Sequence, residues 1–282
     1  MATTDRIMRR DRGGLMQRRF VLRIAMICVP LLTACASMAQ GIARERNALW
    51  HVVHNVCVPD QRIFASPVPC TAVDLAAGYA IVRDPDPFAQ THFLLVPTTR
   101  ISGIEDPVLL SPDASNYWAE AWRARRYVDQ RAGRVLGRDE LSLAVNSVYG
   151  RTQDQLHIHI DCIKPAVKAA LRAHARAIGP HWTPFPVLLA GEPYLARRID
   201  SADLSGVNPF RLLAGLPEAR AAMGEESLVV TGETGADRRP GFILLAGRTS
   251  PDRGSKWGEA LQDHRCALAQ SPARRVEWPP AS

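Results

Sequence analysis

The chain has 282 residues, of which 46% are hydrophobic and 22% are charged, a composition that suits a globular protein with a sizeable core. Its formal net charge is +7, but residues 1–40 contribute +5 of this, because seven Arg residues there are balanced by only two Asp residues. The rest of the chain is nearly neutral and has no basic stripe interleaved with aromatic residues, so we expect no nucleic-acid partner.

The amino-terminal segment 1–40 has the pattern of an export signal or membrane anchor. Two arginines precede an apolar run over residues 20–39, as in such signals. Three outcomes stay open. The segment Leu32–Cys35 resembles a bacterial lipoprotein box, which would leave Cys35 lipidated. The segment Ser37–Ala39 would suit ordinary signal peptidase. The apolar run could also remain as an uncleaved anchor, although it is short for a spanning helix.

The first half of the remaining chain combines helices with short strands. Hydrophobic spacing predicts helices over residues 45–56 and 115–132. Short apolar runs bounded by turn residues predict strands over residues 79–83, 92–96 and 141–145. We expect the first two of these strands to form an antiparallel hairpin.

A strictly alternating segment follows at residues 155–161, which read Gln-Leu-His-Ile-His-Ile-Asp and predict a β-strand. Gln155, His157, His159 and Asp161 then share one face, and the apolar residues between them face a core. Imidazole groups accept and release protons, or attack phosphorus, near neutral pH. The polar face is therefore the main candidate for chemistry in this chain.

The second half is less regular. We expect an Ala-rich helix over residues 166–178, a strand pair at 227–231 and 242–246, a closing helix over 255–269, and a loose tail over 271–282. Together the elements predict an α+β fold, in which an antiparallel sheet flanked by helices is followed by an additional carboxyl-terminal α+β portion.

Cysteine usage fits an exported protein. Beyond residue 40 the chain has an even number of cysteines, which suggests two disulfides. Pairing Cys57 with Cys70 would close a Pro-rich loop, and pairing Cys162 with Cys266 would tie the end of the histidine strand to the carboxyl-terminal segment. This is one of three possible connectivities. No Cys-x-x-Cys spacing occurs, so a zinc site is not indicated.

His157 and His159 admit three interpretations. They could be structural histidines on a strand. They could bind a metal ion with Asp161, His92 or His264 as a third ligand, but none of these stands at a diagnostic spacing. They could also perform nucleophilic catalysis on a phosphoanhydride. We expect no metal or other cofactor, and we interpret His92 and His264 as structural residues.

The context of the strand favours the third interpretation. The segment Thr91–Ser102 resembles the strand and turn that precede the active site of histidine-triad (HIT) hydrolases and transferases. Asn146 stands eleven residues before His157 and Gln153 stands four before it, and both offsets resemble those of the family. The resemblance covers about residues 75–165 and implies a HIT-like fold.

One branch of that superfamily, the bacterial CDP-diacylglycerol diphosphatases, is resembled from about residue 50 to residue 266. The similar segments are Gly150–His159, Cys162–Ile163 and Leu261–Cys266, together with the two cysteines around the Pro-rich loop. The resemblance implies one hydrolase domain over residues 41–270. It also implies hydrolysis of the pyrophosphate bond of CDP-diacylglycerol to CMP and phosphatidate, as part of phospholipid metabolism.

The resemblance also implies roles for individual residues. His159 takes the nucleophile position and would form a cytidylyl-histidine intermediate, while His157 would contact phosphate oxygens. The candidate substrate-binding residues are Asn146, Thr152, Gln153, Gln155 and Asp161. Asp161 stands where the family usually has a third histidine, and we expect it to orient an imidazole. A shift of the register by two residues, which would make His157 the nucleophile, stays open.

A liponucleotide substrate implies a location. We expect the catalytic portion on the periplasmic side of a bacterial inner membrane, where it meets CDP-diacylglycerol without a protein partner. Two other functions remain as alternatives. One is an exported HIT-type nucleotidyl hydrolase or transferase that acts on a soluble nucleotide. The other is a non-catalytic envelope lipoprotein, which only the acid at Asp161 favours.

Overall fold

The computed structural model describes residues 46–235, 239–251 and 258–270. The expected export signal over 1–40 and the expected tail over 271–282 lie outside these ranges. The chain divides into a unit of residues 1–47 and a unit of residues 48–282, and all elements described below belong to the second unit.

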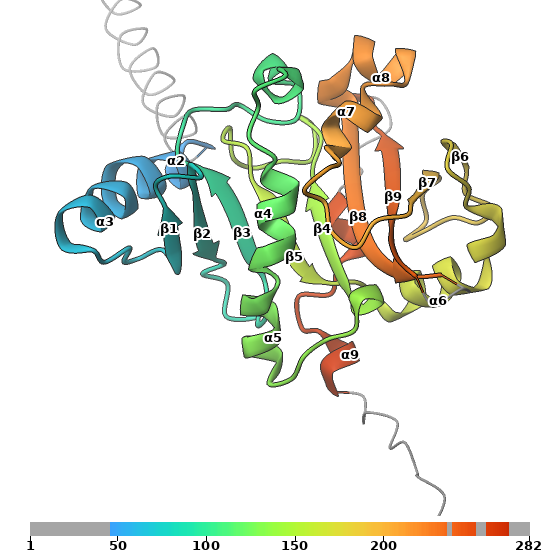
Figure 1. Ribbon diagram of the computed structural model, residues 1–282, viewed down its shortest axis with the longest axis horizontal. Coiled ribbons are helices and arrows are strands. Elements are labelled where there is room, and N and C mark those ends of the chain that lie inside the picture. Colours follow the sequence, from blue (N-terminus) through green and yellow to red (C-terminus); the bar gives the residue numbers. More distant parts are fainter. Residues whose placement is uncertain (1–45, 236–238, 252–257, 271–282) are drawn as a thin grey trace, which may run out of the picture. The chain divides into compact units, whose positions relative to one another are not determined.

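One nine-stranded antiparallel sheet forms the framework of the described residues, with the spatial order β1-β2-β3-β5-β4-β8-β9-β7-β6 (Figure 1). The strands are β1 Ala72–Asp74, β2 Tyr79–Arg83, β3 Phe93–Pro97, β4 Leu141–Val145, β5 Ile158–Cys162, β6 Thr183–Pro184, β7 Leu195–Ile199, β8 Glu226–Thr234 and β9 Pro240–Arg248. Strand β5 pairs with β3 on one side and with β4 on the other, so it lies in the interior of the sheet.

Helical segments connect and cover the strands. The α-helices are α2 Ala48–Val52, α3 Val58–Phe64, α4 Tyr117–Ala124, α5 Arg126–Ala132, α6 Pro165–Ala173, α7 Pro209–Leu213, α8 Pro217–Ala221 and α9 Ala267–Gln270. The π-turn η1 spans Val53–Cys57, and the 3₁₀ turns are η2 Pro107–Leu110, η3 Arg138–Glu140, η4 Ala175–Ala177, η5 Met223–Glu225 and η7 Gly258–Leu261. None of the helices in these described ranges is long and apolar enough to cross a bilayer.

The two faces of β5 have different surroundings. Ile158 and Ile160 point into the largest core cluster, where they join Trp118 and Trp122 of α4, the helix that lies across the middle strands in Figure 1. Fully burying an aliphatic side chain of this size stabilises the fold by about 1.5–3 kcal/mol. The alternation of the strand therefore fixes which side chains reach the opposite face.

Two smaller cores occupy that opposite face. One packs α6 and η7 against β4, β8 and β9 and includes Ala144, and the other packs η1 and α3 against β2 and β3, with Leu94 at its margin. Ala144 and Leu94 are the two cross-strand neighbours of His159. The polar face of β5 therefore lies between two helical layers that come from opposite ends of the chain.

The α+β class predicted from the sequence is confirmed, and so is the hairpin of β2 and β3. Strands β2 and β4 have the predicted bounds, and β8 and β9 pair as expected but are longer. Strand β5 starts at Ile158, three residues later than predicted, because the side chain of Gln155 turns toward residues 97–101.

Several other expectations need correction. The helix predicted over residues 115–132 is two helices, α4 and α5, separated at Arg125. The helix predicted over 255–269 is the short turn η7 and the short helix α9, and residues 252–257 lie outside the described ranges. Strand β7 was not predicted, because Arg197 and Arg198 interrupt the alternation that would have indicated it.

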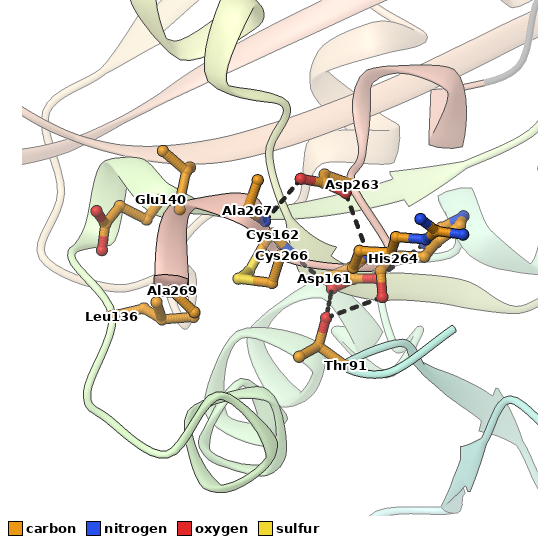
Figure 2. Close-up of a disulfide and its surroundings, with 12 residues drawn as sticks. Thr91, Leu136, Glu140, Asp161, Cys162, Asp263, His264, Cys266, Ala267 and Ala269 are labelled. Carbon is orange, nitrogen blue, oxygen red and sulfur yellow. Dashed lines mark hydrogen bonds and ion pairs between the residues drawn. A yellow bond between two sulfur atoms is a disulfide. The ribbon is translucent and has the colours of Figure 1, made fainter. Parts of the chain in front are cut away.

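Both expected disulfides are present. Cys57 pairs with Cys70 across the Pro-rich loop, and Cys162 pairs with Cys266 over a separation of 104 residues. Figure 2 shows the second bridge, which holds the end of β5 beside the carboxyl-terminal segment. The backbone N–H of Asp263 also donates to the carbonyl of Cys162 at 2.8 Å, so the segment is fixed at its backbone as well.

Candidate active site

The polar face of β5 is buried. His157 is 7% exposed and His159 is 5% exposed, whereas Asp161 is fully buried. Their side chains lie opposite the core that holds Ile158 and Ile160, as the alternation predicted. Buried polar groups need hydrogen-bond partners, so the chemistry of the face is set by what each side chain contacts.

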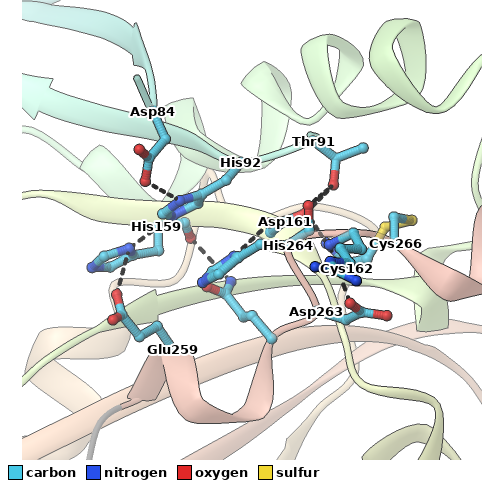
Figure 3. A network of polar contacts seen from close by, with 12 residues as sticks. Asp84, Thr91, His92, His159, Asp161, Cys162, Glu259, Asp263, His264 and Cys266 are labelled. Atoms are coloured by element: carbon cyan, nitrogen blue, oxygen red, sulfur yellow. Dashed lines mark hydrogen bonds and ion pairs between the residues drawn. A yellow bond between two sulfur atoms is a disulfide. The ribbon is translucent and has the colours of Figure 1, made fainter. Parts of the chain in front are cut away.

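His159 is held at both ring nitrogens. Its Nδ1 lies 2.9 Å from Oε2 of Glu259 on η7, as Figure 3 shows. Its Nε2 lies 3.3 Å from the amide nitrogen of Asn146. The backbone N–H of Glu259 donates to Oδ1 of Asn146 at 3.2 Å, which turns the amide N–H₂ toward the ring. A carboxylate at Nδ1 requires a proton there, so Nε2 keeps its lone pair.

Glu259 is ionised in this arrangement. Burial alone would raise its pKa, but the electrostatic interaction and the hydrogen bond with the His159 imidazole outweigh burial and lower the pKa well below the usual range. An ionised carboxylate beside Nδ1 stabilises positive charge that develops on the imidazole. Sequence reasoning missed Glu259, because nothing in its local pattern indicates that a residue 100 positions after His159 folds back onto β5.

His92 was interpreted as a structural histidine, but it belongs to the same network. Its Nδ1–H donates to Oδ2 of Asp84 at 2.8 Å, and its Nε2 lies 2.9 Å from Nδ1 of His159. The two rings are parallel within 5°, with centroids 5.1 Å apart. Burial lowers the pKa of His92, so the ring is neutral and its Nε2 accepts a share of the His159 proton. Asp84 was not predicted as a site residue.

His157 stands edge-on to His159, with ring centroids 4.8 Å apart. Its Nδ1–H donates to the backbone carbonyl of Gln155 at 2.7 Å. Burial, reinforced by the neighbouring His159, lowers the pKa of His157 to about 3. The ring is therefore neutral in the absence of substrate and presents an unprotonated Nε2.

Asp161 orients an imidazole as expected, but the imidazole is His264 rather than a histidine of its own strand. Its Oδ2 accepts from Nδ1–H of His264 at 2.8 Å, and its Oδ1 accepts from the Thr91 hydroxyl at 2.6 Å and from the N–H of Cys162 at 2.7 Å. Burial alone would lower the pKa of His264, but the hydrogen bond and charge of Asp161 raise it. His264, interpreted earlier as structural, thus holds its proton more strongly than a free imidazole does, beside the other rings.

The glutamines and Thr152 occupy different places. The Gln155 amide donates to the carbonyls of Pro97 and Thr99 at 3.0 and 2.8 Å and accepts from Ile101 N at 3.3 Å. The expected contact of Gln155 with phosphate oxygens conflicts with this geometry, because both amide protons are used. Gln153 Oε1 accepts from the N–H of Leu49 on α2 at 2.9 Å, and Thr152 is exposed on the loop.

One group of potential metal ligands occurs here: His92, Asp161 and His264 have nitrogen and oxygen atoms within 4.8 Å of one another. Asp161 already accepts three hydrogen bonds, and both nitrogens of His92 have partners. A metal ion bound here would have to replace these hydrogen bonds.

Comparison with known proteins agrees with the identity that the histidine strand suggested. A family profile described as CDP-diacylglycerol pyrophosphatase matches residues 44–270. A CDP-diacylglycerol pyrophosphatase of Yersinia pestis is 40% identical over 255 residues, which cover 89% of this chain and 95% of that protein. The range matched by the profile contains every residue of the network around His159.

Proposed function

The chain belongs to the CDP-diacylglycerol pyrophosphatase family, and from that premise we propose how its histidine network hydrolyses the pyrophosphate bond of CDP-diacylglycerol. The protein is a hydrolase of phosphorus-containing anhydrides, and the products are CMP and phosphatidate. The observation that supports a histidine nucleophile is the pairing of Glu259 with Nδ1 of His159, because it holds the ring proton on Nδ1 and leaves Nε2 unprotonated.

In the first step, Nε2 of His159 attacks the phosphorus on the cytidine side. The bond from this phosphorus to the bridging oxygen breaks, the oxygen keeps the electron pair, and phosphatidate leaves. In the second step, water attacks the same phosphorus and loses a proton to solvent, the P–N bond breaks, its electron pair returns to Nε2, and CMP leaves. Attack places positive charge on the imidazole, and the ionised Glu259 at 2.9 Å stabilises that charge in both steps.

The other predicted residues support this reaction in two ways. We propose that His157 takes up a proton when an anionic phosphate replaces solvent beside it, and then donates from Nε2 to a phosphate oxygen. Asn146, Gln153 and Thr152 complete the contacts to the nucleotide. Gln155 contributes by position, since its amide ties the segment after β3 to the residue before His157.

The nucleophile and the register are tested together by His159→Asn and His157→Asn, assayed with CDP-diacylglycerol that carries label in the cytidine. We expect His159→Asn to lose turnover and acid-labile labelling. His157→Asn should be slower but should still form labelled protein, with the label mapped to His159. Label on His157 in the wild-type protein would establish the shifted register instead.

The HIT-like relationship and the location remain proposals. The relationship is supported by the offsets of Asn146 and Gln153 from His157, and export by the two disulfides, since disulfides persist in oxidising compartments. We propose that residues 1–40 place the catalytic unit at the periplasmic side of the inner membrane, with Cys35 as a lipid attachment site. Recovery of full-length protein in the soluble cytoplasmic fraction would contradict this location.

A further inference from the structure

A cleft of about 500 Å³ opens beside the histidine network. The lining residues that matter here are Phe88, Ala89, Lys164, Glu259, His264 and Arg265. Glu259 also contacts His159, so the cleft adjoins the proposed nucleophile through a single side chain. We call this space the His264 cleft.

His264 is the exposed end of a charged pair whose other end is buried. Its side chain is 34% exposed, whereas that of Asp161 is 0% exposed. Nδ1–H donates to Asp161, and Nε2 has no hydrogen-bond partner within the described ranges. The protonated imidazole carries a proton on both nitrogens, so a charged N–H remains available to a ligand.

The position of this imidazole is fixed from several sides. The ring stacks on His92 with centroids 4.2 Å apart, and the carbonyl of His264 accepts from the N–H of Gln90 at 2.8 Å. The Cys162–Cys266 bridge follows two residues later. A donor held in this way needs little reorganisation to meet a ligand.

The charges around the cleft favour an anion at His264. Glu259 is already paired with Nδ1 of His159 at 2.9 Å, and the Asp263 carboxylate already accepts from the backbone N–H groups of Arg265 and Ala267. Asp86 also lines the cleft, and its carboxylate accepts from the N–H of Phe88. Lys164 and Arg265 add cationic groups to the same wall.

The same cleft also has apolar surface. Phe88 is 67% exposed, and the guanidinium of Arg265 lies 5.8 Å from the centre of its ring. An anionic group at His264 would therefore have exposed aromatic surface next to it. This combination suits a phosphate monoester attached to an apolar chain.

We propose that the His264 cleft binds the phosphate monoester of the leaving half of the substrate, phosphatidate, and that Nε2–H of His264 donates to one of its oxygens. This rests on the proposed function and deepens it, because it assigns the lipid side of the pyrophosphate to a site distinct from the cytidine side. As the bond to the bridging oxygen breaks, charge builds on the leaving phosphate, and the charged N–H stabilises it.

The test compares product inhibition in the wild type, His264→Gln and the control His181→Gln, which changes an exposed histidine outside the network. Dihexanoyl phosphatidate, inorganic phosphate and CMP serve as inhibitors. Loss of a charge-assisted hydrogen bond predicts an inhibition constant for phosphatidate about tenfold or more higher in His264→Gln, with the CMP constant unchanged. If inhibition by inorganic phosphate is weakened as well, the site recognises the phosphate group alone. If only inhibition by phosphatidate is weakened, the site also recognises the lipid chain.

An unchanged phosphatidate constant, or equal weakening of phosphatidate and CMP, would overturn the assignment. If His264→Gln does not fold, the pH dependence of wild-type inhibition by hexyl sulfate replaces it as the test, because the charge of this inhibitor is constant with pH. The proposal requires this inhibition to weaken as pH rises past the titration of His264. Inhibition that does not change with pH overturns the proposal. The charged and titratable groups around His264 are Asp161, Glu259, Asp84, His92, Asp86, Asp263, Lys164 and Arg265. Labelling of His159, measured in the same samples, reports separately on the proposed function.

Discussion

Replacing Glu259 by Gln is the sharpest test of the carboxylate at His159. The substitution keeps the size and a hydrogen-bond acceptor but removes the charge that lies 2.9 Å from Nδ1. At an effective dielectric constant of about 20, unit charges about 4 Å apart interact by about 4 kcal/mol. The imidazole gains only part of a charge in the transition state and the Glu259 side chain is 30% exposed, so about half of this, ~2 kcal/mol, is expected.

That loss corresponds to a decrease of about thirtyfold in kcat. The assay is release of CMP from CDP-diacylglycerol in mixed micelles, with thermal unfolding measured in parallel to confirm the fold. The matched control is Glu225→Gln, whose carboxylate is 31% exposed and pairs with Arg248 away from the histidines. The control should stay within about twofold of the wild type. A Glu259→Gln enzyme as fast as the control would refute a charge-stabilising role.

Two further predictions concern stability. Removing the Cys162–Cys266 bridge, which spans 104 residues, should lower the free energy of unfolding by about 4–5 kcal/mol, whereas removing the short Cys57–Cys70 bridge should lower it by about 3 kcal/mol. Urea unfolding of the two double Cys→Ser variants measures both losses. A larger loss for the Cys57–Cys70 variant would contradict the loop-closure argument. Because the folded-state pKa of His264 is raised, its pairing with Asp161 stabilises the fold fully below the unfolded-state pKa and less as pH rises through the folded-state value. Asp161→Asn should therefore lose more stability relative to the wild type at about pH 5.5 than at about pH 8.5, on either side of the ordinary histidine pKa, and an equal loss at both would exclude this linkage.

The sequence predicted the residues of the central strand and their faces because a period of two is a local property. The alternation from Leu156 to Asp161 needs no information from elsewhere, and the structure has the predicted faces. Gln155 shares that alternation, but it lies before the first residue of β5, Ile158. Its amide finds closer partners in the backbone after β3, which local pattern could not show.

The sequence did not predict that His92, Glu259 and His264 belong to the network, for a different reason. His92 directly precedes β3, and Glu259 and His264 lie in the segment predicted as a helix, so each resembles an ordinary polar residue in its own neighbourhood. What brings them to His159 is the pairing of β3 with β5 and the bridge at Cys266. Such contacts depend on tertiary structure and are visible only when the chain is folded.

The origin of the site in distant parts of the chain also sets when activity can begin during synthesis. Strand β5 is complete at residue 162, but the carboxylate of Glu259 and the cation of His264 are translated about a hundred residues later. A nascent chain that has folded its central strands therefore holds two histidines without their partners Glu259 and His264. Under the proposed mechanism, hydrolysis begins only after the last segment has been translated and has docked against β5.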